Sequence, residues 1–181
     1  MGLAKNILIT GIPGVGKTTV IKKVVEKLGE RCGGFYTEEI RSEGIRVGFK
    51  IVSLDGKTGV LASISLSGAP KVGKYGVNLQ EINNIAVTSI AEAIRSEKIV
   101  VIDEIGKMEV LSPLFRSLVV LALDSQNVVI ATVSEKGKED FFDEIKMRSD
   151  VELYVATFEN RDILPNIILN RLRNFLSGDE Q

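Results

Sequence analysis

Gly11-Ile12-Pro13-Gly14-Val15-Gly16-Lys17-Thr18 decides the fold, because it lies between an apolar run at residues 7–9 and a segment whose apolar residues follow one helix face. Glycines at this spacing let successive backbone N–H groups point at one polyphosphate, and the following helix adds its positive dipole end. In such a loop Lys17 reaches the β- and γ-phosphates, and the Thr18 hydroxyl is a Mg²⁺ ligand. The stretch therefore predicts a nucleoside-triphosphate site, with an ordinary tight turn as the competing interpretation.

Two acidic residues, Asp103 and Glu104, directly follow a β-branched run at residues 99–102. Such a run is typical of a strand buried on both faces, and ligands in open α/β sheets lie beyond the carboxyl ends of strands. If this strand neighbours the one before the loop, Asp103 holds Mg²⁺ with Thr18 through water, and Glu104 orients or deprotonates the attacking water. A helix-capping acid or a solvated strand end is the alternative for the pair taken alone.

Phosphoryl transfer also needs positive charge near the terminal phosphate beyond that of Lys17 and the metal. The candidates are Lys107, Lys71, Lys74, Arg41 and Arg148, and for each of them a solvated surface charge is the alternative. Asn160 and Arg161 follow the last expected strand, where an amide can read a base edge and a guanidinium can stack on a base. The competing interpretation there is a helix N-cap at Asp162 with an exposed Arg161.

The order of elements predicts an α/β protein. Strands are expected at residues 7–9, 35–41, 45–54, 60–64, 99–102, 128–132 and 151–155, and helices at residues 20–28, 82–94, 113–123, 141–147 and from about 162. Residues 66–79 are expected to form a loop. This pattern indicates a P-loop NTPase three-layer fold: a mostly parallel sheet with helices on both faces and an antiparallel β-meander insertion, in a single domain over residues 1–181.

Composition excludes several classes of function. The 181 residues contain no histidine, which excludes Ser-His-Asp or Cys-His catalysis and histidine-ligated zinc or haem within this chain. The single cysteine, Cys32, forms no internal disulfide and is expected to be a small buried side chain. The 23 basic and 24 acidic residues nearly cancel, so no global charge favours nucleic acid or a membrane surface. Without a signal peptide or an apolar run of about 20 residues, we expect a cytoplasmic monomer with no membrane partner.

Five segments together resemble one family. They are Gly11 to Thr19, Gly34-Phe35-Tyr36-Thr37-Glu38-Glu39, Gly73-Lys74-Tyr75-Gly76-Val77, Ile102-Asp103-Glu104-Ile105-Gly106-Lys107-Met108-Glu109 and Asn160-Arg161-Asp162. The set resembles the small P-loop nucleoside-triphosphatase family of thermophilic microbes, whose animal relative is called cancer-related nucleoside-triphosphatase. The resemblance implies slow, Mg²⁺-dependent hydrolysis of the β–γ bond of ATP, GTP, CTP and UTP, with broad base specificity. It also implies that the strand-end segment at residues 101–108 holds the nucleotide together with the glycine-rich loop.

The expected site combines these inferences. The expected catalytic residues are Glu104, Lys17 and Lys107, and the expected metal ligands are Thr18 and Asp103. The expected nucleotide-binding residues are Gly11, Ile12, Pro13, Gly14, Val15, Gly16, Lys17, Thr18, Thr19, Val101, Ile102, Asp103, Glu104, Ile105, Gly106, Lys107, Met108, Asn160 and Arg161.

Two other functions share these motifs. A nucleotide or small-molecule kinase has the same phosphate-binding loop but delivers phosphate to an acceptor, and its lid is usually rich in arginine. The candidate lid at residues 66–79 contains no arginine, which weakens this alternative. A nucleotide-gated switch, in which hydrolysis resets a partner-binding loop, is the third interpretation.

Overall fold

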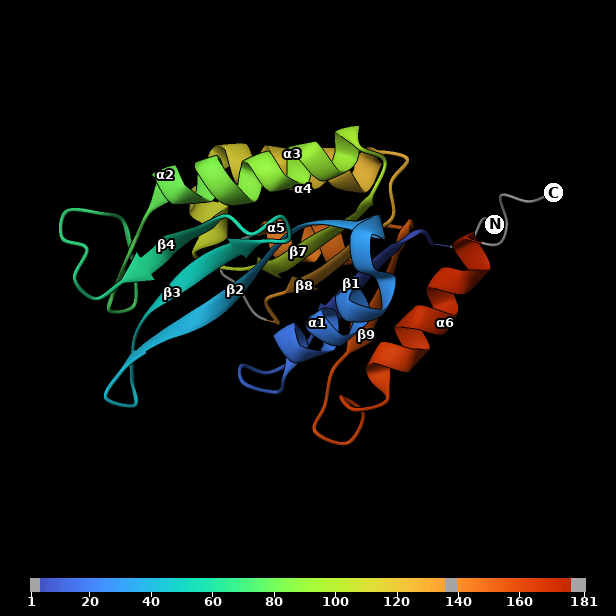
Figure 1. Cartoon of the computed structure of the whole chain (residues 1–181), viewed down its shortest axis with the longest axis horizontal. Helices are drawn as coiled ribbons and strands as arrows, with labels where there is room; N and C mark the ends of the chain where they lie inside the picture. The colour runs from blue at the N-terminus through green and yellow to red at the C-terminus, as the bar shows by residue number, and fades with distance from the viewer. Residues whose placement is uncertain (1–3, 136–139, 177–181) are drawn as a thin grey trace.

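The computed structural model describes residues 4–135 and 140–176, which form one mixed sheet between two layers of helices (Figure 1). In this part of the chain the strands are β1 (Asn6–Thr10), β2 (Cys32–Ser42), β3 (Ile45–Ser53), β4 (Thr58–Ser63), β5 (Lys71–Val72), β6 (Tyr75–Val77), β7 (Ile99–Ile105), β8 (Val129–Val133) and β9 (Val151–Val155). The helices are α1 (Lys17–Leu28), α2 (Leu79–Glu81), α3 (Thr88–Arg95), α4 (Pro113–Asp124), α5 (Asp140–Lys146) and α6 (Leu164–Leu176). A π-helical segment, η2 (Ile82–Val87), joins α2 to α3, and η1 (Gly29–Arg31) and η3 (Glu109–Leu111) are 3-10 turns.

The sheet has a parallel half and an antiparallel half, in the order β5-β6-β4-β3-β2-β7-β8-β1-β9. Strands β2, β7, β8, β1 and β9 pair in parallel, with Gly34 opposite Val101 and Ile7 opposite Ile130. Strands β3, β4, β6 and β5 extend the sheet through antiparallel pairs only. The predicted strands and the meander are present, but antiparallel pairing makes up more of the sheet than the prediction of a mostly parallel sheet allows.

Two further predictions, the separate meander insertion and the loop at residues 66–79, are wrong in part. The meander is no separate insertion, because β2 belongs to both halves: its first residues pair with β7 and its later ones with β3. Residues 66–79 are also not simply a loop, since β5 and β6 form a tight hairpin in which Val72 lies opposite Tyr75. The turn between them places Gly73 at φ 59°, in the left-handed region that glycine adopts without strain.

Helices cover both faces of the sheet, as the three-layer prediction requires (Figure 1). One face packs against α1 and α6 through a cluster that includes Val20, Ile21 and Ile168. The other face packs against the helices from α2 to α5 through a larger cluster, in which the rings of Phe35 and Phe115 meet edge to face at 6.1 Å. No helix in the described ranges has the length and apolar character needed to cross a bilayer.

Helix boundaries follow the local signals in the sequence. Ser112 caps α4 by accepting a hydrogen bond from the backbone N–H of Phe115 at 3.2 Å, and Pro113 occupies the first turn. Gly29 ends α1 at φ 58° and donates its N–H to the carbonyl of Val25. The last helix begins at Leu164, two positions later than predicted, after turns around Asn160.

The parallel half of the sheet determines where a site can form. Strands β1, β7 and β8 are adjacent and parallel, so their carboxyl ends meet at one edge. The glycine-rich loop follows β1, the acidic pair directly precedes Ile105, the last residue of β7, and Ser134 follows β8 at this edge. Three segments far apart in the sequence are therefore brought together.

Candidate functional site

The loop between β1 and α1 has a backbone path that requires glycine. At Gly11, φ is 147° and an added Cβ would lie 2.5 Å from the carbonyl oxygen of Ala156. Gly16, at φ 107°, leads directly into the first turn of α1. Val15 is fully buried and anchors the loop, whereas Ile12 is 46% exposed. The loop is thus a curved backbone segment that Val15 anchors in the core, and its open side lies at the start of α1.

Lys17 projects from the first turn of α1 back over this loop. Its ammonium donates hydrogen bonds to the carbonyl oxygens of Gly11 at 2.8 Å and Ile12 at 3.4 Å. Only 9% of the residue is exposed, and the described residues offer it no carboxylate partner. A largely buried cation bonded only to neutral groups favours an incoming anion.

Asp103 is buried beside α1 at the end of β7. Its Oδ1 accepts a hydrogen bond from the Thr132 hydroxyl at 2.6 Å, while its buried Oδ2 has no hydrogen-bond partner among the described residues. Burial raises the pKa of Asp103, and the hydroxyls of Thr132 and Thr18 partly oppose this rise, which places Thr18 beside the same carboxylate. An unpartnered carboxylate oxygen next to a threonine hydroxyl fits a hydrated Mg²⁺. In the described part of the chain no three acidic or thiol ligands cluster, so such a cation would also need phosphate and water oxygens.

Glu104, the next residue, is half-buried and is held in place by β8. Its Oε1 accepts a hydrogen bond from the Ser134 hydroxyl at 3.0 Å. Ser134 is a site residue that the sequence did not predict; the only signal for it was a hydroxyl residue just beyond the expected strand at residues 128–132. Together the two hydroxyls at the end of β8 orient both members of the acidic pair.

A third carboxyl, that of Glu109, lies under the same edge. Glu109 is 4% exposed, and burial, reinforced by the negative charge of Glu104, raises its pKa to about 8. An added Cβ on Gly106 would lie 2.7 Å from Glu109 Oε2 and 3.4 Å from Glu104 Cδ. Gly106 therefore leaves room for both carboxyl groups, and the predicted segment at residues 101–108 ends one residue before this buried acid.

This buried carboxyl should make folding stability depend on pH. The folded chain keeps a proton on Glu109 up to about pH 8, whereas the unfolded chain releases it near the ordinary value of 4.5. Its contribution to stability is complete below the unfolded pKa, so the free energy of unfolding should fall between about pH 5 and 8, by on the order of 2–4 kcal/mol. Urea denaturation across this range should show that Glu109→Gln lacks this part of the fall.

The matched control is Glu26→Gln, on the exposed face of α1. Its stability should follow that of the wild-type protein over the same pH range. Parallel curves for Glu109→Gln and the wild type would contradict the prediction.

The other expected residues of the strand end differ in their exposure. Val101, Ile102 and Ile105 have no exposed surface, so their side chains belong to the core and only their backbone could reach a nucleotide. Met108 is partly buried, and Lys107 is exposed at the rim of a cavity that also contains Glu104.

The candidate cations for the terminal phosphate lie in different places. Arg148 bonds Asp150 and Asp124 at the amino-terminal ends of the strands, away from the loop. Arg41 lies at the β2–β3 turn and bonds Glu39. Lys71 and Lys74 belong to the β5–β6 hairpin, where Lys74 lies over the ring of Tyr75 at 5.4 Å.

Arg46, which the sequence did not single out, lies in a groove with Lys17, Thr18 and Glu104. It is on β3, and the alternating pattern of that strand marked only its apolar residues. Lys22 also lines this groove, where its ammonium bonds Glu38 at 2.6 Å. The structure therefore adds Arg46 and Lys22 to the cations near the loop and separates Arg148 from the site.

Asn160 and Arg161 lie on the other side of the loop. The Asn160 amide is engaged locally: its Oδ1 accepts from the Thr157 N–H at 2.8 Å and its Nδ2 donates to the Val155 carbonyl at 2.9 Å. Arg161 lies over the ring of Phe158 at 5.2 Å and, with Gly16 and Thr19, lines a hollow of about 230 Å³. Recognition of a base by Asn160 stays a prediction, and its amide would first have to leave these bonds.

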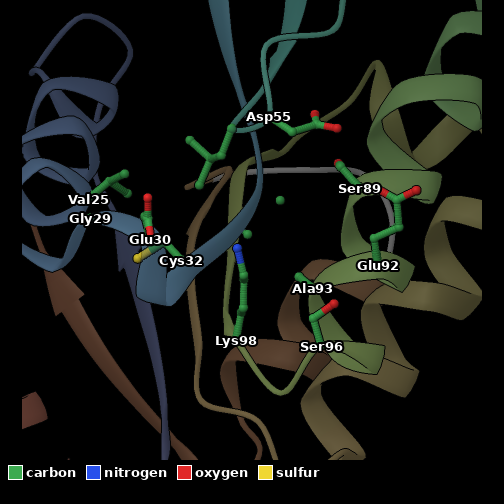
Figure 2. Close-up of a pocket in the computed structure, with 13 residues that line it drawn as sticks. Val25, Gly29, Glu30, Cys32, Asp55, Ser89, Glu92, Ala93, Ser96 and Lys98 are labelled. Carbon is green, nitrogen blue, oxygen red and sulfur yellow. The ribbon is translucent and has the colours of Figure 1, made fainter.

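A separate cavity of about 490 Å³ lies at the amino-terminal ends of β2 and β7, the opposite edge of the parallel strands (Figure 2). The amine of Lys98 points into it, and the carboxylates of Asp55 and Glu92 lie across from that amine. Cys32 lines its wall, and burial raises the pKa of its thiol to about 11, so the thiol stays protonated, as expected of a buried structural cysteine. Ligands of α/β sheets lie at the carboxyl edge, so this cavity is not the candidate active site.

Comparisons with known proteins cover nearly the whole chain. A family model described as NTPase matches residues 6–169. Nucleoside-triphosphatase THEP1 of Thermotoga sp. (strain RQ2) is 47% identical over 176 residues, which cover 97% of this chain and 99% of that protein. The crystal structure of THEP1 from the hyperthermophile Aquifex aeolicus aligns with a TM-score of 0.86 at 41% identity, covering 92% of this chain and 98% of that one. The solution structure of a human cancer-related nucleoside triphosphatase aligns with a TM-score of 0.81 at 37% identity, covering 94% and 98%.

Proposed function

The chain belongs to the NTPase family, as its motifs predicted, and is a nucleoside-triphosphate hydrolase. On this premise we propose that it cleaves the β–γ bond of ATP, GTP, CTP and UTP, that it does so slowly, and that it requires Mg²⁺. One observation carries the proposal. At a single sheet edge lie the loop, the ammonium of Lys17 and the Oδ2 of Asp103, neither of which has a charged partner in residues 4–135 and 140–176, with Glu104 beside them. These are the groups that in-line attack of water on a terminal phosphate requires.

Each role falls to a residue of this chain. Lys17 and the loop amides bind the β- and γ-phosphates and stabilise the charge that develops on the bridging oxygen. Thr18 and Asp103 would hold Mg²⁺, which when bound neutralises further phosphate charge. Glu104, fixed by Ser134, orients the attacking water and accepts its proton.

Broad base specificity agrees with the surroundings of Arg161. A guanidinium over an aromatic ring offers a flat surface on which any base can stack. Discrimination between bases would need polar side-chain groups aimed at the base edge, and the amide of Asn160, next to Arg161 in the sequence, is already bonded to the backbone.

The direct test measures phosphate release from the four ribonucleoside triphosphates. Rates are expected within about tenfold of one another and below about 1 s⁻¹, the low end of enzyme turnover. EDTA should abolish release and added Mg²⁺ should restore it, while ADP should give no phosphate because it lacks the β–γ bond. Activity that persists in EDTA, or is confined to one base, would contradict the proposal.

We assign the additional positive charge at the terminal phosphate to Arg46. Its guanidinium donates to Glu39 Oε1 at 2.9 Å and to the Tyr75 hydroxyl at 3.0 Å, and its side chain is 45% exposed, so it is anchored but accessible from the groove. Removing a cation that acts on the transition state lowers kcat more than it raises KM.

Arg46→Ala is therefore expected to lower kcat by about 10- to 100-fold in steady-state phosphate release, with KM changed by less than about threefold. Arg41→Ala is the matched control, because Arg41 bonds the same Glu39 but does not line the groove. Equal losses of kcat in the two variants would show that the conformation of the β2–β3 hairpin, and not the charge of Arg46, affects the reaction.

A further inference from the structure

A cavity of about 440 Å³ opens between the acidic strand end and the antiparallel half of the sheet. We call it the side cavity. Its polar end contains Lys17, Glu104 and Ser134, and its apolar wall is formed by Phe49, Leu61, Val72 and Met108. It therefore begins at the groups assigned to the terminal phosphate and extends away from the hollow beside Arg161.

Three of the four apolar wall residues come from the antiparallel half of the sheet, and the fourth, Met108, follows β7. Phe49 comes from β3, Leu61 from β4 and Val72 from β5. Leu61 belongs to the main core, and Phe49 and Val72 pack against that core while leaving part of their surface in the cavity. The β5–β6 hairpin thus takes the place of the loop predicted at residues 66–79 and contributes one wall.

Water as the phosphate acceptor does not explain this cavity. A bound water needs room for a single molecule and two to four polar partners, which Glu104 and its neighbours can provide. A bound triphosphate would occupy the part of this volume that Gly11, Pro13 and Lys17 line, and the remainder is mostly apolar with a few polar groups at one end, as is typical of small-molecule pockets. The shape and lining favour a second organic molecule next to the terminal phosphate.

The charges restrict what that molecule can be. Glu104 lies at the polar end, and Glu135 and Lys107 are exposed at the rim, where their charges oppose each other, while the buried Glu109 keeps its proton and adds no charge. Once a triphosphate neutralises Lys17, the Glu104 carboxylate at the polar end, together with the charge of the triphosphate itself, disfavours an acceptor with a phosphate or carboxylate of its own. Nucleoside monophosphates are disfavoured for this reason, and a neutral molecule with an apolar body is favoured.

We propose that the side cavity binds a neutral alcohol with an apolar body and that the protein transfers the terminal phosphoryl group to it. The inference rests on the proposed nucleotide site. The alcohol oxygen forms a bond to the γ-phosphorus while its proton passes to Glu104. The bond between that phosphorus and the β–γ bridging oxygen breaks with its electron pair on the nucleoside diphosphate, and the products are a phosphate monoester and the diphosphate.

The probe is p-methylbenzyl alcohol, whose aromatic body of about nine non-hydrogen atoms fits a pocket of this size. Incubation with ATP and Mg²⁺ should give p-methylbenzyl phosphate, detected by phosphorus NMR and mass spectrometry, and formation should saturate with alcohol. Two matched probes use the wild-type protein: p-(hydroxymethyl)benzoate, of similar shape but anionic, and methanol, which has no apolar body. Each should give an ester-to-phosphate ratio lower by at least about tenfold at equal concentration.

A variant pair locates the acceptor. Val72→Phe narrows the apolar wall and should lower the ester-to-phosphate ratio by about tenfold, whereas Val60→Phe, on β4 with 41% of its surface exposed, should not. Phosphate release without any formation of ester would overturn this proposal but not the proposed hydrolase function. Inhibition of phosphate release by the alcohol, without phosphoryl transfer to it, would have the same meaning. Equal ratios for the two variants, or for the neutral and anionic probes, would overturn it too. Failure of all nucleotides to bind would instead count against the proposed function.

Discussion

Lys17→Ala is expected to lower the affinity for a non-hydrolysable ATP analogue by at least about 100-fold and to reduce phosphate release below detection. The ammonium is largely buried, and among the residues that the structure describes it bonds two loop carbonyls and no carboxylate. Charge-assisted hydrogen bonds to phosphate are among the strongest polar contacts, and the alanine variant loses them completely. Titration calorimetry with Mg²⁺ present measures the affinity directly.

The control for this variant is Lys27→Ala, in the last turn of the same helix and exposed to solvent. It should bind the analogue within about twofold of the wild type, since an exposed charge at that distance is screened. Circular dichroism should show that both variants are folded. Near wild-type affinity in a folded Lys17→Ala protein would refute the assignment of the loop.

The local parts of the site could be predicted from the sequence, and the contacts between them could not. The loop and the acidic pair are each written in consecutive residues, so glycine spacing and a β-branched run were enough to find them. Ser134 and Arg46 come to the site through strand order: Ser134 because β8 lies between β7 and β1, and Arg46 because β3 pairs with β2. The sequence around either residue contains no signal for this strand order.

The same distinction applies to the fold. Strands with an apolar run or clear alternation and helices with one apolar face were predicted close to their observed bounds. The β5–β6 hairpin was missed because its strands have two and three residues and its glycines resemble those of any loop. The share of antiparallel pairing was underestimated because β2 pairs on both of its edges, a fact that depends on the tertiary arrangement.

Glu109 was missed for a different reason. Its segment was noticed as part of a family motif, but a glutamate in a short turn is normally expected to be exposed. Only the packing of η3 beneath β7 shows that it is buried, and only burial changes its pKa. Buried titratable groups of this kind can be identified only from the three-dimensional structure.

Glu104→Gln should separate binding from chemistry. The amide preserves the shape of the side chain but cannot accept a proton from water, so kcat is expected to fall by about 100- to 1,000-fold. The affinity for the non-hydrolysable analogue should change by less than about threefold, because Glu104 makes no bond that holds the phosphates. Single-turnover phosphate release and calorimetry measure the two effects independently.

Ser134→Ala gives a graded version of the same test. It leaves the Glu104 carboxylate intact but removes the 3.0 Å hydrogen bond that orients it, and a hydrogen bond of about 1–1.5 kcal/mol corresponds to a loss of about tenfold in kcat. Ser117→Ala, on the exposed side of α4, should have no effect.

If Glu104 acts as base, the combined Glu104→Gln, Ser134→Ala variant should be no slower than Glu104→Gln alone, because the serine acts only through that carboxylate. Additive losses of kcat would instead mean that Ser134 contacts the reacting phosphate or water itself. If the Glu104→Gln variant hydrolysed ATP at the wild-type rate, Glu104 would not be the base.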